Sequence, residues 1–182
     1  MATTKHTLVA LVADKPGVLN RMSSLFRRRG FNIESIAVGH SELSHLSRMT
    51  VVVDGSTSMV EQVRKQLDKI VDVVKVSDIT GEGVITRELA LIKVKATASS
   101  RSEIIQIVDI FRANIVDVGA DSVTIEVTGD EQKVNSLFDL LRTFGIREVV
   151  RTGRIAMTRG GLRLIPVAGE SSNTAAREKK AA

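Results

Sequence analysis

The chain has 182 residues, of which 43% are hydrophobic and 26% charged, with a formal net charge of +5. This composition is typical of a globular protein with one domain or two small ones. The chain contains no cysteine, which excludes disulfides, zinc–thiolate sites and thiol nucleophiles.

The composition also argues against nucleic-acid and membrane partners. Basic residues are spread along the chain, and the five phenylalanines lie in or beside apolar runs, where core packing is their natural role. Proteins that bind single-stranded nucleic acid usually expose aromatic platforms. The chain starts without a long apolar signal region and has no uninterrupted apolar stretch of about 18 residues. We therefore expect an intracellular, cytoplasmic protein without a membrane or nucleic-acid partner.

The first half of the chain predicts the order strand, helix, strand, strand, helix, strand. An almost wholly apolar run at residues 7–13 predicts a strand covered on both faces, and Pro16-Gly17 ends it. A helix follows up to Gly30, because apolar residues recur there at helical spacing. They are Val18, Leu19, Met22, Leu25 and Phe26.

Three strands and a helix complete this first half. Residues 31–38 and 48–53 are predicted strands, and residues 73–79 close the unit as a fourth strand. Between them, Ser58 and Glu61 fit a capping box at the start of the second helix.

The second half repeats the same order. Residues 88–95, 114–118, 123–127 and 146–151 are predicted strands. Helical spacing of apolar residues predicts a helix after the first of these strands and another after the third. The residues concerned are Ile104, Ile107, Val108 and Phe111, then Val134, Leu137, Phe138 and Leu141.

The pairs Asn32-Ile33 and Asn114-Ile115 each start the strand after the first helix, which gives a repeat of 82 residues. The fold class is therefore α+β, with two tandem ferredoxin-like βαββαβ units. We expect domains at residues 1–80 and 81–160, joined by a hinge at residues 80–83, and a disordered tail at residues 161–182. Two cores of this size are marginal alone, which favours assembly with partners.

Catalytic and metal-binding residues are not evident. The three histidines have no metal-ligand or triad spacing, and the sequence has no HExxH, GxSxG or Walker loop. We interpret the histidines as surface polar residues. Arg27-Arg28-Arg29 could bind an anion, but cations at the end of a helix complement its dipole, so we interpret them as a solvated helix end.

The loop after the first strand is more informative. Gly17 allows close approach of a ligand at a helix start, where free N–H groups favour a carboxylate. Asp14 could accept hydrogen bonds from an ammonium group, and Asn32 offers a donor and an acceptor. The matching loop of the second repeat, residues 97–102, has no Pro-Gly. We therefore predict an effector site for a free amino acid in the first repeat alone. Its predicted residues are Asp14, Gly17, Val18, Leu19, Asn32 and Ile33.

Several motifs in order resemble the regulatory small subunit of acetolactate synthase (acetohydroxyacid synthase), a family with an ACT domain. They are LVADKPGVLNRMSSLFRRRGFNIESIAVG, LSRMTVVV, KQLDKIVDVVKV and RELALIKV, and the resemblance covers about residues 5–160. It implies that residues 7–80 form an ACT domain. This domain would pair with a second copy across strand edges and bind valine between protomers. Asp14 to Leu19 would come from one protomer, and Asn32 and Ile33 from the other. Many members have Asn at the position of Asp14.

The resemblance also implies a partner. The acetolactate synthase large subunit carries thiamine diphosphate, magnesium and FAD and joins two pyruvates into 2-acetolactate with release of CO2. The small subunit has no catalytic, metal or cofactor site of its own. It raises the activity of the large subunit and confers feedback inhibition by valine in the synthesis of valine, isoleucine and leucine. The alternative is a stand-alone ACT-type amino-acid-binding regulator.

Overall fold

The computed structural model describes residues 4–81 and 83–160. The predicted tail at residues 161–182 lies outside the described residues, as does position 82 of the predicted hinge. The chain divides into two compact units, the first built mainly from residues before position 86 and the second mainly from Thr86–Ala156.

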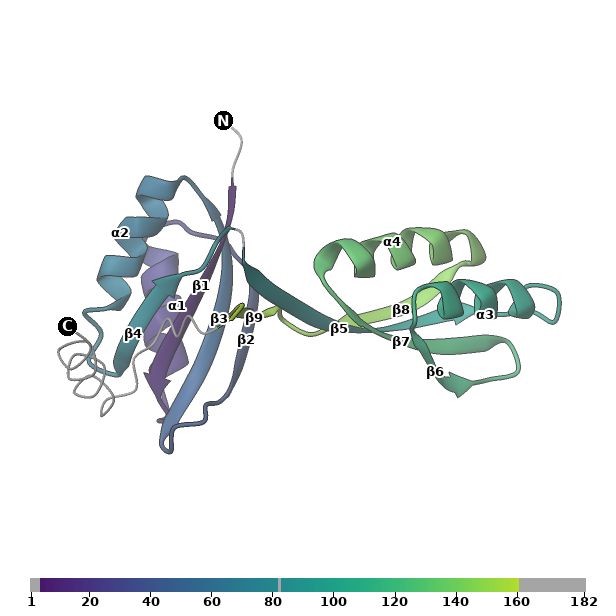
Figure 1. The fold of residues 1–182 in the computed structure, drawn as a ribbon, viewed down its shortest axis with the longest axis horizontal. Helices are drawn as coiled ribbons and strands as arrows, with labels where there is room; N and C mark the ends of the chain where they lie inside the picture. Colours follow the sequence, from purple (N-terminus) through teal and green to yellow (C-terminus); the bar gives the residue numbers. More distant parts are fainter. Residues whose placement is uncertain (1–3, 82, 161–182) are drawn as a thin grey trace, which may run out of the picture. The chain divides into compact units, whose positions relative to one another are not determined.

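The first unit has the predicted βαββαβ order. Its elements are β1 (Thr4–Ala13), α1 (Val18–Arg28), β2 (Ile33–His40), β3 (Leu46–Gly55), α2 (Thr57–Leu67) and β4 (Val73–Asp78). The sheet is antiparallel with the strand order β2-β3-β1-β4, so β2 and β4 are its edges. Both helices lie on the same face of this sheet (Figure 1).

Apolar side chains at helical spacing bury one stripe of each helix. The predicted stripe of α1 is buried apart from Leu19, and α2 contributes Val60, Val63 and Leu67. Each of these side chains stabilises the fold by about 1.5–3 kcal/mol when it is fully buried. Leu8 to Val12 in β1 are at most 4% exposed, as expected for a strand covered on both faces.

The second unit repeats this arrangement. Its strand order, β6-β7-β5-β8, matches that of the first sheet. Its helices also share one face of the sheet (Figure 1). The elements are β5 (Val84–Lys95), α3 (Arg101–Ile110), β6 (Asn114–Val118), β7 (Ser122–Gly129), α4 (Glu131–Leu141), the 3-10 turn η1 (Arg142–Phe144) and β8 (Ile146–Arg151).

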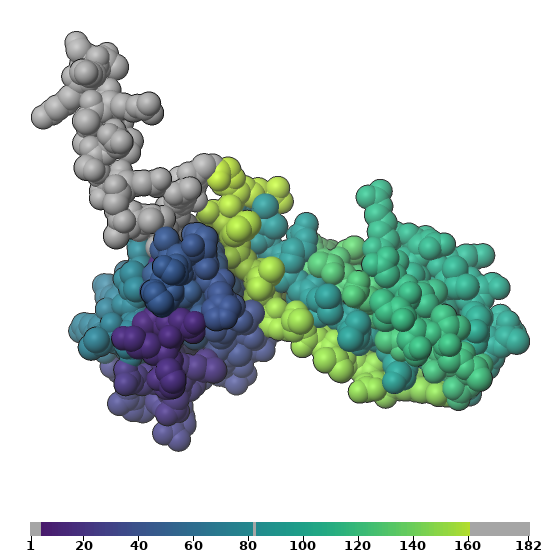
Figure 2. Space-filling model, turned by 90° about the horizontal axis from the view of Figure 1, so that it is seen from below, coloured from purple at the N-terminus to yellow at the C-terminus, as the bar shows by residue number. Residues whose placement is uncertain are grey.

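The bounds of β1, β2 and β3 shift by two or three residues, and further details differ from the prediction. α2 starts one residue after Ser56, whose hydroxyl accepts a hydrogen bond from Met59 N (3.4 Å), so Ser58 is not the cap. β5 begins four residues earlier than predicted. The sequence pattern also missed β9 (Ile155–Thr158), which pairs with β5. The segment of β9 reaches the surface in Figure 2, where it is yellow-green.

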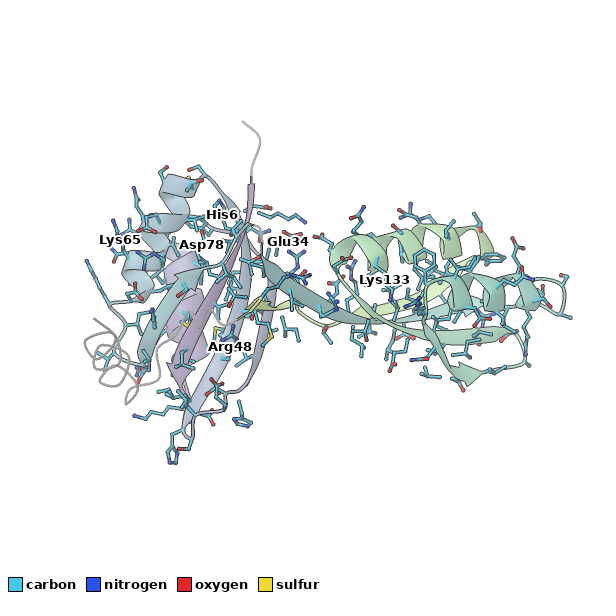
Figure 3. All side chains as sticks on the ribbon, viewed as in Figure 1. His6, Glu34, Arg48, Lys65, Asp78 and Lys133 are labelled. Atoms are coloured by element: carbon cyan, nitrogen blue, oxygen red, sulfur yellow. The ribbon has the colours of Figure 1, made fainter. Side chains whose placement is uncertain are left out.

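Each unit has a side-chain contact between its first and fourth strands. In the first unit, His6 Nδ1 lies 3.0 Å from Asp78 Oδ2 (Figure 3). In the second, Arg151 donates to the carboxylate of Glu88. Glu88 follows His6 by 82 residues, and Asp78 and Arg151 are equivalent by register, because they lie opposite Leu8 and Ala90. The interpretation of the histidines as surface residues is wrong for His6, which is only 4% exposed.

Candidate effector site

The predicted loop connects β1 to the first turn of α1. Gly17 is the N-cap of α1 and has φ 88°, a left-handed conformation that favours glycine. No side chain caps the helix and its first turn contains no acidic residue. The first N–H with an intrahelical acceptor is that of Arg21, which donates to Gly17 O (3.0 Å). The preceding N–H groups therefore form an open site for an anion such as a carboxylate.

Asp14 lies beside this helix start and is held by two other strands. Its N–H donates to His45 O (2.8 Å), and its Oδ1 accepts a hydrogen bond from Ser47 Oγ (3.3 Å) at the start of β3. Its Oδ2 lies 3.3 Å from His40 Nδ1 at the end of β2. The Asp14 side chain remains 48% exposed. A carboxylate in this position can accept hydrogen bonds from an ammonium group while it stays oriented by Ser47.

Ser47 and His40 did not emerge from the sequence as site residues. Ser47 is 6% exposed, and the β1–β3 register places it opposite Val12, near the end of β1. No local motif marks either residue. Only the pairing of β1 with β3 would have predicted that Ser47 lies near Asp14.

Val18 and Leu19 contribute differently. Val18 is 3% exposed and belongs to the core of the first unit, so its backbone N–H is the group that it can offer to a ligand. Leu19 is 48% exposed at the same helix start. Its side chain is therefore the one that could contact the apolar part of an effector.

Asn32 and Ile33 lie at the other end of α1. Asn32 is exposed and precedes β2, whereas Ile33 is partly buried and starts it. α1 has 11 residues and is thus about 16 Å long, which separates these two residues from the helix start. One chain therefore does not bring all six predicted residues together. A site that uses all of them needs two copies of the chain.

In the equivalent loop of the second unit, side-chain hydroxyl groups accept hydrogen bonds from backbone N–H groups of the same loop. Thr97 N donates to Ser100 Oγ (3.0 Å), and Ser100 N donates to Thr97 Oγ1 (3.3 Å). Nearby, Arg147 hydrogen-bonds Asp121 and holds the pKa of this carboxyl below its usual value. Like α1, α3 has no side-chain cap, but its first turn carries Glu103, whose negative charge disfavours a carboxylate ligand at this helix start.

Two surface hollows lie elsewhere in the described structure. One, of about 310 Å³, lies between α1 and α2, and the other, of about 450 Å³, lies between α4 and β8. None of the six predicted effector residues lines either of them. Within residues 4–81 and 83–160, no group of three His, Cys, Asp or Glu side chains could hold a metal ion. No helix in the same part of the chain is long and apolar enough to cross a membrane.

Known proteins match both units. Residues 8–75 match the ACT domain of the acetohydroxyacid synthase small-subunit type, and residues 87–160 match the family described as the small subunit of acetolactate synthase. A probable acetolactate synthase small subunit from Archaeoglobus fulgidus is 57% identical over 156 residues, which cover 86% of this chain and 98% of the relative.

Two further matches agree. The acetolactate synthase small subunit of Bacillus subtilis is 48% identical over 158 residues, which cover 86% of this chain and 91% of the relative. The crystal structure of the Thermotoga maritima small subunit superposes with a TM-score of 0.81 at 43% identity and covers 87% of this chain and 99% of that one. With this agreement in sequence and in fold, the chain belongs to the family of acetolactate synthase small subunits, the regulatory subunits of that enzyme.

Proposed function

We propose that the chain activates the acetolactate synthase large subunit and makes it sensitive to inhibition by valine. The observation that carries this proposal is the match to small subunits over more than nine tenths of their length. The large subunit would supply thiamine diphosphate, magnesium and FAD and form 2-acetolactate and CO2 from two pyruvates. The chain would act on it in the cytoplasm, in the synthesis of branched-chain amino acids.

The proposed valine site lies between two copies of the first unit. The open start of α1 suits the valine carboxylate, and Asp14 suits its ammonium group. Asn32 and Ile33 would come from the other copy, because α1 separates them from the loop of their own chain. Leu19 and Ile33 would then contact the isopropyl group.

An edge-to-edge homodimer would complete this site. β2 is an edge strand of the first sheet, and the edge of a sheet can pair with a second copy. If two β2 strands pair antiparallel, the start of one lies beside the end of the other. His40 at the end of β2 already lies against Asp14. Asn32 of one copy would therefore approach the Asp14 loop of its partner.

Valine would act by favouring one state of the complex over another. Burial of its side chain is worth about 1.5–3 kcal/mol, and allosteric coupling energies are typically about 1–3 kcal/mol. A ligand shifts an equilibrium only by its difference in affinity for the two states. Closure of the two-chain site in the less active state would provide that difference.

The test is acetolactate formation by a cognate large subunit, with and without the chain, across a valine titration. Activation that valine reverses supports the proposal. Activation without valine sensitivity would retain the partnership but contradict valine as the effector. If the chain leaves the large subunit unchanged, the proposal fails and a stand-alone regulator takes its place.

A further inference from the structure

The end of α1 carries three exposed arginines without partners. Arg27, Arg28 and Arg29 have no ion pair and no side-chain hydrogen bond among the described residues. Many other arginines of the chain do meet acceptors. Arg64, for example, donates to Glu61, and the hydrogen bond lowers the pKa of that carboxyl to about 2.

Two of these arginines line the hollow of about 310 Å³ between α1 and α2. Its other lining residues are Leu25, which is 7% exposed, and Gln66 of α2. The hollow thus combines two guanidinium groups, an amide and an apolar floor, with no acidic side chain. Guanidinium groups bind carboxylates in a bidentate geometry, so this lining selects for carboxylates.

The helix dipole explains basic residues at this helix end, but it does not explain the hollow. The equivalent end of α3 has Asp109, Ile110 and Phe111 and no basic residue in its last turn. The hollow of the second unit also differs, because its arginines are already engaged. Arg142 lies 3.5 Å from Asp139, and Arg151 donates to Glu88 and Asn135.

We propose that the Arg28–Arg29 hollow is a docking surface for an acidic segment of the large subunit. This inference rests on the proposed function. A second copy of the chain is a poor occupant, because it would present like charges to like charges. A free small anion is a poorer occupant, because it would gain only contacts with exposed guanidinium groups, which salt screens. A protein segment can add apolar contact with Leu25 to its carboxylate contacts.

The experiment titrates the full-length chain into the large subunit at about 50 mM and about 300 mM salt, where screening differs strongly. The variant is R28E/R29E, and the matched control is R27E, which changes the same helix end outside the hollow. We expect R28E/R29E to need roughly tenfold more protein for half-maximal activation at low salt, with a weaker salt dependence than the wild type. R27E should stay within about twofold of the wild type.

Valine binding measured by calorimetry verifies that R28E/R29E still folds. Activation by R28E/R29E with the wild-type midpoint at both salt concentrations would overturn the docking surface. Saturable binding of inorganic phosphate that R28E/R29E abolishes, with activation unchanged, would also overturn it and assign the hollow to a free anion. If the wild-type chain does not activate the large subunit at all, the proposed function fails first, and the docking surface fails with it.

Discussion

Gly17 combines two properties that a carboxylate site needs. Its φ of 88° lets the chain turn directly into α1, and a Cβ atom built on it has no neighbour within 4 Å. The space in front of the first N–H groups is therefore open. Asp14 lies beside it with one oxygen held by Ser47 and the other near His40. The loop therefore offers N–H groups for the carboxylate of an amino acid and the Asp14 carboxylate for its ammonium group.

Replacement of Gly17 by Asp should abolish valine inhibition and leave activation intact. The new carboxylate would lie where the carboxylate of valine binds, and like charges in contact cost several kcal/mol. We expect the valine concentration for half-inhibition to rise at least about tenfold, since about 1.4 kcal/mol corresponds to that factor. Acetolactate formation across a valine titration measures the change.

Two control variants separate charge from backbone strain. Gly17→Ala introduces a side chain at the same φ without a charge and should keep more valine sensitivity than Gly17→Asp. Gly83→Asp places the same side chain at a similar φ of 80°, also with open space around it. Unchanged inhibition in Gly17→Asp would show that the effector binds elsewhere.

At the scale of elements, the sequence predicts strands and helices best where burial alternates or recurs regularly. β6 and β8 have the predicted bounds, and the buried stripe of α1 contains four of the five predicted residues. The pattern failed at β9, because its four residues, with Ile155 and Met157 exposed, are ordered by pairing with β5 rather than by a local signal. The contact between Asp14 and Ser47 was missed for the same reason, since it depends on strand register.

The start of α2 offers a direct test of the helix cap. Ser56 accepts the hydrogen bond from Met59 N, whereas Ser58 lies inside the helix. Ser56→Ala should lower the free energy of unfolding by about 1 kcal/mol, the usual loss for an N-cap serine. Ser58→Ala should change it by less than about half that amount, because alanine favours a helix interior. Urea denaturation of both variants measures the difference, and an equal loss would contradict the assignment of Ser56 as the cap.

Asp78 links β4 to β1 and should control stability in acid. Burial alone would raise the pKa of Asp78, but hydrogen bonds from Thr80 and His6 outweigh it and hold the pKa below its usual value. The unfolded chain therefore binds more protons at Asp78, so stability is present above about pH 4 and lost as the pH falls through the folded-state pKa.

Asp78→Asn should flatten this acid dependence. The variant should be less stable than the wild type at neutral pH, and the difference should shrink as the pH falls below about 4 toward the lower folded-state pKa of Asp78. Denaturation followed by circular dichroism between pH 7 and pH 3 measures this. Asp117→Asn, an exposed site in β6, serves as the control. A constant difference between wild type and Asp78→Asn at every pH would rule out the linkage.

At the scale of the whole molecule, the repeat has diverged in function. Both units keep the same strand order and a side-chain contact between equivalent positions of their first and fourth strands. The first unit has a helix start without an acidic residue, and Arg27, Arg28 and Arg29 have no ion pair among the described residues. In the second unit, Glu103 lies in the first turn of α3, and Thr97 and Ser100 hydrogen-bond within the matching loop. Two units of the same fold, of which the first has a helix start suited to an anion, fit a subunit in which one half binds an effector.

A mixed dimer can test whether each valine site is built from two chains. Gly17→Asp alters the loop, and Asn32→Ala alters the residue proposed to come from the other copy. We expect each variant to lose valine inhibition when it is tested alone, because both sites of its homodimer then carry the substitution. In a dimer of one Gly17→Asp chain and one Asn32→Ala chain, one site receives both changes and the other receives neither. Purified by two different tags, this mixed dimer should regain valine binding at half the wild-type stoichiometry. A site contained in a single chain would leave both sites defective in the mixed dimer, so failure to regain binding would refute the two-chain arrangement.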